Sequence, residues 1–347
     1  MKHGRGPSKG GHSRSDQTRG PSRGPSRSDT GPQRQEQPKP TAAPQAKPVL
    51  GIGGIPLGAP TKFKNNPQVP RPRPAVLVPA GEPAARPQKG APFNLPALEV
   101  MTTTLWSYPS QHYWSPTKRR LIGVDGAKYT GATPSWVIWQ LLMRYTSEGD
   151  AVLDPMVGSG TTLDVCDDLG RSGLGLDLNP QHPQVKLSDA RSLPLKGNEV
   201  DFVFIDPPYS THVNYSDDPR CIGKLDSGGS DGGAAYYEAM TKVTREIARV
   251  LKPGKHMALY VSDSYVKGRG DKGFMPIGFE LFEIMRKPWA AGGAGLLPVD
   301  IIAVERGNQK LARGNWHKAA EGGNFYLRGF NYLFICRKAQ LAVNARS

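Results

Sequence analysis

The sequence predicts an α/β fold in which a mostly parallel sheet is covered by helices on both faces. Short apolar runs alternate with longer segments whose apolar residues recur at helical spacing. Three of the apolar runs end in an aspartate, at Asp154, Asp177 and Asp206. Ligands of parallel sheets bind at the carboxyl ends of the strands, so three carboxylates at three strand ends predict a binding site there.

The first quarter of the chain does not fit this pattern. Up to position 90 it contains 16 Lys and Arg, 4 Asp and Glu, 17 Pro and one aromatic residue, Phe63. This segment therefore carries +12 of the formal net charge of +15. So few large apolar residues cannot bury enough surface to offset the entropy of ordering. We expect a disordered basic tail and linker over residues 1–95, a folded domain over 96–340 and a short C-terminal tail over 341–347.

The tail has two possible roles. The sequence Arg-Gly-Pro-Ser occurs three times, beginning at Arg5, Arg19 and Arg23. Such a segment can act as an arm that follows nucleic-acid phosphates, with an affinity that depends on salt. It can equally be a solvated linker whose charge only maintains solubility, and the tail alone does not decide between these roles.

Several protein classes are excluded by composition. No apolar run approaches the ~18 residues of a membrane span, and no hydrophobic stretch follows the charged start as in a signal peptide. We expect a soluble cytoplasmic protein with no membrane partner. The three cysteines, Cys166, Cys221 and Cys336, are far apart and never form a C-x-x-C pair. We therefore expect reduced thiols and no metal site.

The individual elements follow from local signals. Residues 134–145 place apolar side chains at helical spacing behind Thr133, an expected N-cap, with Pro134 in the first turn. The next expected elements are a strand at 151–154, a helix at 163–169 and strands at 173–177 and 200–205. In the last third we expect a helix at 236–251 stopped by Pro253-Gly254, a strand at 256–261, a helix at 277–286 and strands at 301–304 and 332–336.

A glycine-containing loop follows the first of these strands, in the segment Asp154-Pro155-Met156-Val157-Gly158-Ser159-Gly160-Thr161-Thr162. It is not a complete dinucleotide fingerprint, because Leu163 replaces the third glycine. The two glycines still allow the backbone to approach a ligand closely. Asp154 suits an ammonium group, and Asp177, about twenty residues later, suits the hydroxyls of a ribose. Together they indicate S-adenosylmethionine, although a structural turn with a chance Gly-x-Gly remains an alternative.

The second motif is Asp206-Pro207-Pro208-Tyr209, directly after an apolar run. The prolines end the strand and hold a rigid turn, which leaves the Asp206 carboxylate and the Pro207 carbonyl as acceptors. Two acceptors suit an exocyclic amino group on a planar base, and they increase the nucleophilicity of its nitrogen. The Tyr209 ring would then stack on a base rotated out of its duplex. The alternative is a structural Pro-Pro loop with a surface tyrosine.

The two motifs together resemble the amino-methyltransferases that modify DNA at adenine N6 or cytosine N4. The similarity extends over roughly residues 100 to 340, including Arg249 to Gly254 and Tyr332 to Lys338. It implies a Rossmann-like methyltransferase fold with a seven-stranded sheet. It also implies S-adenosylmethionine binding by the first loop (Asp154, Pro155, Gly158, Ser159, Gly160 and Thr161), by Asp177 and by Asp189 near the adenine. The implied catalytic residues are Asp206, Pro207, Pro208 and Tyr209, acting on a base flipped out of duplex DNA.

The resemblance leaves the target base and the nucleic acid open. Asp-Pro-Pro-Tyr is more often found with adenine N6 and Ser-Pro-Pro-Tyr with cytosine N4, so adenine is favoured. The competing hypotheses are an RNA methyltransferase acting on guanine N2 or adenine N6, and a nucleic-acid-binding protein with an inactive core. The family also implies a bacterial or phage-encoded protein associated with the nucleoid. Neither the oligomeric state nor the recognition sequence follows from the sequence.

Substrate contacts are expected from two loops. The first, 210–233, contains His212, Asn214 and Tyr215, and the second, 292–324, contains Arg313 and Trp316. Basic residues interleaved with aromatic ones suit phosphates and unstacked bases, although a disordered glycine-rich insertion explains the second loop as well. A further aromatic cluster, which either packs the sheet or lines the base pocket, comprises Trp106, Tyr108, Tyr113 and Trp114.

Overall fold

The computed structural model describes residues 95–123, 131–211, 213–266, 273–306 and 314–340. All of them belong to one compact unit, Pro72–Ser347. The predicted basic tail, apart from Leu95, and the predicted C-terminal tail lie outside the described residues.

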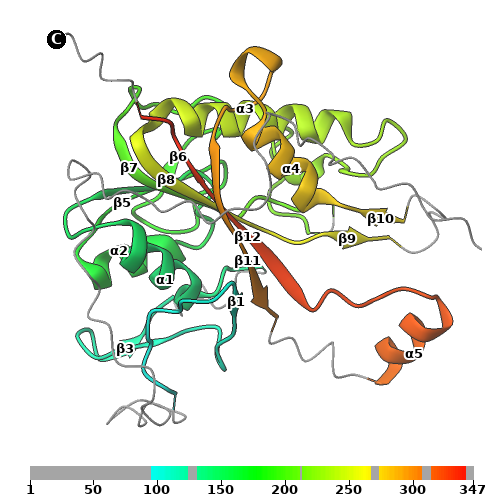
Figure 1. The fold of residues 1–347 in the computed structure, drawn as a ribbon, viewed down its shortest axis with the longest axis horizontal. Coiled ribbons are helices and arrows are strands. Elements are labelled where there is room, and N and C mark those ends of the chain that lie inside the picture. The colour runs from blue at the N-terminus through cyan, green and yellow to red at the C-terminus, as the bar shows by residue number, and fades with distance from the viewer. Residues whose placement is uncertain (1–94, 124–130, 212, 267–272, 307–313, 341–347) are drawn as a thin grey trace, which may run out of the picture. The chain divides into compact units, whose positions relative to one another are not determined.

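A mostly parallel sheet forms the centre of the domain, as predicted (Figure 1). Its eight strands in the described ranges follow the order β1-β11-β12-β8-β7-β4-β5-β6. Within this sheet β12 runs antiparallel to both of its neighbours, and the other pairs are parallel. The strands are β1 (Leu105–Trp106), β4 (Ala151–Asp154), β5 (Ser172–Asp177), β6 (Lys186–Leu187), β7 (Val200–Ile205), β8 (Leu251–Val261), β11 (Leu297–Glu305) and β12 (Phe330–Arg337).

The strand count differs from the seven that we expected. Local signals predicted six of the eight strands and missed β6 and β1. The two residues of β1 pair in parallel with Ala303 and Val304 of β11 at the edge of the sheet. A two-residue strand has no periodicity that a sequence pattern can reveal. It is held in place by packing, because Trp106 is buried between the sheet and α1.

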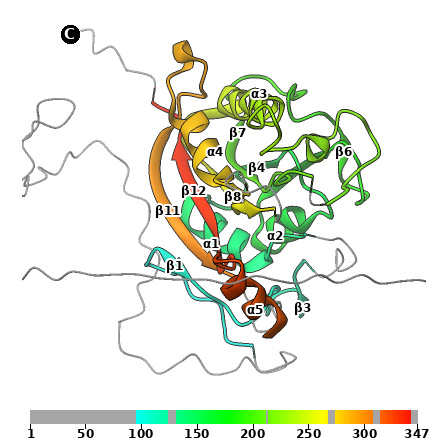
Figure 2. The same ribbon diagram turned by 90° about the vertical axis from the view of Figure 1, so that its right-hand side faces the viewer.

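Helices cover both faces of the sheet, which confirms the predicted fold class. α1 (Ser135–Tyr145) and α2 (Thr161–Leu169) lie on one face, and α3 (Ala234–Val250) and α4 (Ile277–Arg286) lie on the other (Figures 1 and 2). The remaining elements are the short strands β2 (Trp114–Ser115), β3 (Arg120–Leu121), β9 (Ser264–Tyr265) and β10 (Phe274–Met275), the 3-10 helices η3 (Ile222–Lys224) and η5 (Trp289–Ala291), and α5 (Gly314–Gly322).

The central strands bury side chains on both faces, which explains their continuous apolar sequences. In β7, Phe202 and Phe204 pack in the core under α1 and α2, whereas Val203 and Ile205 pack in the core under α3 and α4. Every residue of β7 is buried. Since successive side chains of a strand alternate between faces, Asp206 after Ile205 is directed toward the side of α1.

Several predicted boundaries were wrong by a few residues. α2 begins at Thr161 rather than at residue 163. α3 ends at Val250, and β8 begins immediately after it and continues through Pro253-Gly254. The pairing of β8 with β7 shifts register across this segment, and Gly254 has a φ of 78°. Pro253-Gly254 was expected to end the preceding helix. Instead, it forms an irregularity inside β8.

The loop predicted over 292–324 is also corrected. β11 occupies residues 297–305 of it, which confirms the strand expected at 301–304 and extends it, and α5 occupies residues 314–322. By contrast, packing was the better interpretation of the aromatic cluster, since Trp106 and Tyr113 are each 2% exposed in the core under α1. No helix among the described residues is long and apolar enough to cross a membrane.

Candidate active site

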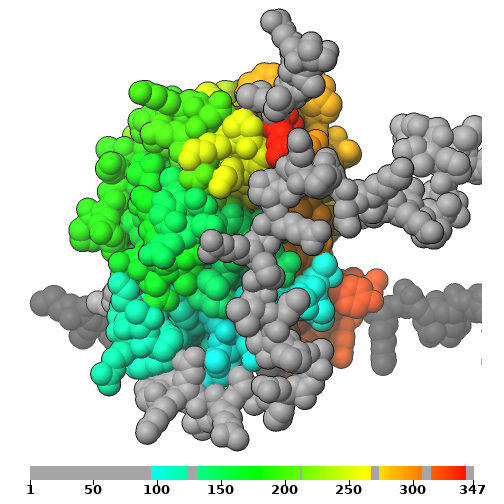
Figure 3. Space-filling view, turned by 60° about the vertical axis from the view of Figure 1, so that its left-hand side comes forward, coloured from blue at the N-terminus to red at the C-terminus, as the bar shows by residue number. Residues whose placement is uncertain are grey.

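A pocket opens at the carboxyl ends of β4, β5 and β7. β4 leads through α2 to β5 on one side, whereas β7 lies on its other side, so the strand order reverses between β4 and β7. Such a reversal is where ligands of open α/β sheets bind. The pocket is partly open to solvent, and residues at the ends of all three strands line it. The green segments that run from β4 to the start of α3 make up one side of the domain (Figure 3).

The loop between β4 and α2 forms the floor of the pocket. Gly158 and Gly160 have φ values of 53° and 91°, a region that favours glycine. A Cβ at Gly160 would also lie 3.0 Å from the His182 ring, so this position accepts only glycine without rearrangement. The Gly158 N–H donates to Asp177 Oδ2 over 2.9 Å, which ties the loop to the end of β5.

Asp154 lies at the bottom of the pocket and is 3% exposed. Its carboxylate accepts hydrogen bonds from Thr162 Oγ1 over 2.5 Å and from the Met156 N–H over 3.1 Å. Burial raises the pKa of Asp154 to about 7, and the nearby carboxylates of Asp177 and Asp206 act in the same direction. Among the described residues, the charges that act most strongly on Asp154 are carboxylates, so a cationic ligand would favour its ionised form.

Two further acidic residues predicted to bind a cofactor also line the pocket. Asp177 accepts N–H groups from Gly158 and Asn179, and burial raises its pKa. Asp189 lies after β6 and pairs with the Arg191 guanidinium at 2.9 and 2.7 Å. Burial of Asp189 acts to raise the pKa of its carboxyl group. The hydrogen bonds from Arg191 outweigh this effect, so the pKa of Asp189 lies below its usual value.

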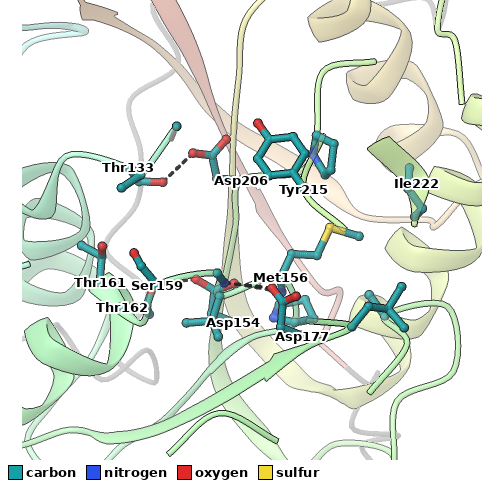
Figure 4. A pocket seen from close by; sticks show the side chains of 18 of the residues that line it. Thr133, Asp154, Met156, Ser159, Thr161, Thr162, Asp177, Asp206, Tyr215 and Ile222 are labelled. Atoms are coloured by element: carbon teal, nitrogen blue, oxygen red, sulfur yellow. Dashed lines mark hydrogen bonds between the residues drawn. The ribbon is translucent and has the colours of Figure 1, made fainter. Parts of the chain in front are cut away.

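Asp206 stands opposite these residues, at the end of β7. Its Oδ2 accepts a hydrogen bond from Thr133 Oγ1 over 2.5 Å (Figure 4). Its Oδ1 accepts one from the Tyr209 hydroxyl over 2.7 Å. Burial raises the pKa of Asp206 to about 7, against the lowering effects of these two hydrogen bonds and of the Arg306 charge. Thr133 was predicted to cap α1, but the N-cap is Pro134, and Thr133 instead bonds Asp206.

The other residues of the Asp-Pro-Pro-Tyr motif differ in their surroundings. Pro207 is buried and does not line the pocket, whereas Pro208 and Tyr209 do. The Pro208 carbonyl accepts a hydrogen bond from the Tyr236 hydroxyl over 2.7 Å, which fixes the turn to α3. The partly buried Tyr209 ring packs against the core under α3 and α4.

The predicted substrate residues are not gathered at one place. Tyr215 lines the pocket, and its carbonyl accepts a hydrogen bond from Asn179 Nδ2 over 3.0 Å. Asn214 does not line the pocket, and its amide lies 3.4 Å from Asp217 Oδ1. Trp316 is 43% exposed on α5 and does not line the pocket either. His212 and Arg313 lie outside the described residues.

The pocket also contains residues that sequence reasoning did not select. Their side chains are mostly small or apolar, so no pattern of charge or spacing indicates them. Thr162 was quoted within the loop motif but was not expected to hold Asp154. Further lining residues of this kind are Gly131, Ala132, Thr133, Ile138, Met156, Val157, Leu178, Ser188, Ala190, Ser216, Cys221 and Ile222.

Residues 64–186 and 200–339 match the DNA methylase family of N6 and N4 methyltransferases. This match covers well over half of the chain, and the chain therefore belongs to that family, which confirms the resemblance of its motifs. The matched region begins in the proline-rich segment, before the residues at which we recognised the similarity.

Curated relatives are similar over short stretches. The type II methyltransferase M.HpaI of Haemophilus parainfluenzae is 31% identical over 80 residues, which is 23% of this chain and 23% of that protein. M2.DpnII of Streptococcus pneumoniae is 31% identical over 72 residues, 21% of this chain and 27% of that protein. The chain thus matches these relatives over about a quarter of their length.

Solved structures show only distant similarity. TrmN from Thermus thermophilus is 18% identical with a TM-score of 0.39 over 62% of this chain and 52% of that chain. A SAM-dependent methyltransferase from Methanosarcina mazei is 14% identical with a TM-score of 0.37 over 58% of this chain and 98% of that chain. TM-scores at this level do not define a shared fold.

The burial of Asp154 predicts a pH-dependent cost in stability. An aspartate in an unfolded chain titrates near ~3.9, whereas Asp154 titrates at about 7 in the folded protein. Ionisation of Asp154 therefore opposes folding increasingly from about pH 4 to pH 7, and the full cost is present above pH 7. In urea unfolding of the ligand-free protein, we expect Asp154→Asn to be more stable than wild type at pH 8, by roughly 1–3 kcal/mol. The difference should shrink toward pH 4, and a variant less stable than wild type at pH 8 would contradict this assignment.

Proposed function

We propose that this protein transfers a methyl group from S-adenosylmethionine to an exocyclic amino group of a base in duplex DNA. The observation that carries the proposal is the position of Asp206. This partly buried acceptor at the end of β7 lines the same pocket as Asp154 and Asp177 at the ends of β4 and β5. Membership of the DNA methylase family supports the same assignment.

The chemistry of the pocket fits this cofactor. Four buried or partly buried carboxylates line one cavity, and a cationic ligand with hydroxyl groups would complement them. Asp154 would hold the ammonium group, Asp177 the ribose hydroxyls, and Asp189 would lie near the adenine. The loop residues Pro155, Gly158, Ser159 and Thr161 line the pocket and would surround the cofactor, whereas Gly160, also predicted to bind it, does not line the pocket. When bound, S-adenosylmethionine supplies an electrophilic methyl group on a sulfonium, which becomes a neutral thioether after transfer.

The residues after β7 would prepare the amine. The lone pair of an exocyclic amino group is delocalised into its ring, so that nitrogen is a poor nucleophile. An ionised Asp206 can accept one of its N–H groups and favour the pyramidal nitrogen, most strongly in the transition state. Tyr209 and Tyr215 provide aromatic surface at the same pocket. A base can reach a recessed acceptor of this kind only after it has left the duplex stack.

We propose adenine N6 as the target, with cytosine N4 as the alternative. Aspartate as the first residue of the motif favours adenine in this family. We also propose that residues 96–340 constitute the catalytic domain, and that the basic residues of 1–95 contact DNA phosphates. Among the described residues, no group of His, Cys, Asp and Glu is arranged to hold a metal ion.

The most direct test is incubation of the purified protein with methyl-labelled S-adenosylmethionine and, in parallel, duplex DNA, single-stranded DNA and RNA. Nucleoside analysis should find the label in N6-methyldeoxyadenosine from DNA. Label in N4-methyldeoxycytidine would select the alternative base, and label only in RNA nucleosides would overturn the DNA assignment. Asp206→Ala should reduce turnover by roughly 100- to 1,000-fold while cofactor binding remains, because the cofactor residues lie on other strands. Asp167→Ala, which removes an exposed carboxylate on α2, serves as the matched control.

The basic tail gives a second test. Removal of residues 1–90 eliminates +12 of the formal charge. We expect weaker DNA binding and a shallower dependence of the logarithm of the affinity on the logarithm of the salt concentration. Turnover at saturating DNA should stay within roughly twofold of wild type if the tail acts only through phosphate contacts. A collapse of saturated turnover would instead place the tail in the active site.

A further inference from the structure

Thr133 connects the start of α1 to the end of β7. It is 8% exposed, and its hydroxyl donates to Asp206 Oδ2 over 2.5 Å, although the two residues are 73 positions apart in sequence. Figure 4 shows the Thr133 hydroxyl directed at the carboxylate across the pocket. α1 begins without any side-chain cap, so the hydroxyl is not used for capping.

We propose that Thr133 is a positioning residue that holds the Asp206 carboxylate in its productive orientation and keeps it ionised for amine binding. This inference rests on the proposed function and deepens it by adding a residue outside the Asp-Pro-Pro-Tyr motif. Thr133 would act through Asp206.

The geometry of the two hydroxyl donors supports this role. The Thr133 hydroxyl binds Oδ2, and the Tyr209 hydroxyl binds Oδ1 over 2.7 Å. They come from different elements, Thr133 from the segment before α1 and Tyr209 from the turn after β7. One donor would leave the carboxylate free to rotate about its last torsion, whereas two donors fix it. An ionised carboxylate has about four lone-pair sites, so its remaining sites stay available to a ligand.

The electrostatic surroundings of Asp206 make each donor important. Among the described residues, the charge of Arg306, directly after β11, lowers the pKa of Asp206. Asp154 carries a like charge when ionised. The tyrosines around Asp206 have raised pKa values because they are buried, so they stay neutral near pH 7. In the described part of the chain, the titratable groups that interact electrostatically with Asp206 are Tyr209 after β7, Tyr215 before η3, Tyr236 on α3, Tyr260 on β8, Asp154 on β4 and Arg306 after β11.

Among the described residues, the Arg306 charge and two hydroxyl donors therefore act against the effect of burial on Asp206. Replacement of Thr133 by valine removes one of these donors and keeps the shape of the side chain. Because a hydrogen bond to an ionised group favours that form, its loss should raise the pKa of Asp206 above about 7. Fewer molecules would then have an ionised acceptor at neutral pH.

The test compares Thr133→Val and Thr133→Ser in the full chain. We expect Thr133→Val to lower the turnover at saturating DNA and cofactor by roughly 10- to 100-fold at pH 7. The acidic limb of its pH profile should move upward by about one unit. The cofactor KM should change by less than about threefold, since Thr133 does not bond the residues of the cofactor loop. Thr133→Ser keeps the donor and should restore both the turnover and the pH profile.

A control separates this role from ordinary stabilisation. Thr244 on α3 is fully buried and its hydroxyl donates to the Thr241 carbonyl, away from Asp206. Thr244→Val therefore loses a buried hydrogen bond, but it should keep the wild-type pH profile. An unchanged turnover and pH profile in Thr133→Val would overturn the inference. Equal losses in Thr133→Val and Thr133→Ser would overturn it as well, because the lost property would then be shape rather than the hydroxyl.

A second measurement does not depend on turnover. Titration of the ¹³C-labelled Asp206 carboxyl by NMR, assigned with Asp206→Asn, should give a higher pKa in Thr133→Val than in wild type or Thr133→Ser. Identical titration curves would overturn the inference even if methyl transfer is found. If wild type transfers no methyl group to any nucleic acid, the proposed function fails, whereas this titration still decides what Thr133 does to Asp206.

Discussion

The placement of carboxylates at the buried edge of a parallel sheet is the constraint on which the rest of the structure depends. Asp154, Asp177 and Asp206 end three strands whose other residues build the two cores, so these side chains lose water as the sheet forms. Compensation comes from backbone N–H groups and hydroxyls supplied by the adjoining turns. The positive φ of Gly158 and Gly160 belongs to the turn that delivers these N–H groups. Even with these hydrogen bonds, and with the Arg306 charge acting on Asp206, the pKa values of Asp154 and Asp206 stay at about 7, so the pocket suits a cation.

The same arrangement separates two tasks on different strands. β4 and β5 provide the carboxylates proposed for the cofactor, and β7 provides the acceptor proposed for the target amine. The strand order reverses between β4 and β7, because the chain passes through β5 and β6 on one side of β4 before it forms β7 on the other side. The carboxylates of β4 and β5 and the acceptor of β7 therefore face one pocket. Stability is reduced as a consequence, because each ionised carboxylate is held where a folded protein would favour a neutral side chain. A site that attracts a cationic ligand therefore lowers the stability of the folded protein when that ligand is not bound.

The sequence predicted the architecture and the principal carboxylates, for a physical reason. Strands buried on both faces must be continuously apolar, and a carboxylate at the end of such a strand stands out from its surroundings. What depends on contacts distant in sequence could not be predicted. Thr133 has the local features of an N-cap, and only the fold brings it to Asp206. The short β1 depends on its pairing with β11, and the irregularity at Pro253-Gly254 depends on pairing between β7 and β8. Asn214 and Trp316 were predicted to bind substrate because of the chemistry of their side chains. Side-chain chemistry does not indicate where a residue lies in the fold, and neither residue lines the pocket.

The central claim is that the pocket holds carboxylates that become ionised when a cationic cofactor binds. Isothermal titration calorimetry with S-adenosylmethionine in buffers of different ionisation enthalpy measures the protons exchanged on binding. At pH 6 Asp154, with a pKa of about 7, is mostly protonated in the ligand-free protein. A bound cation favours its ionised form, so the account predicts net proton release at pH 6 that fades at higher pH and is reduced in Asp154→Asn. Cofactor binding at pH 6 without proton release, or with proton uptake, would contradict it.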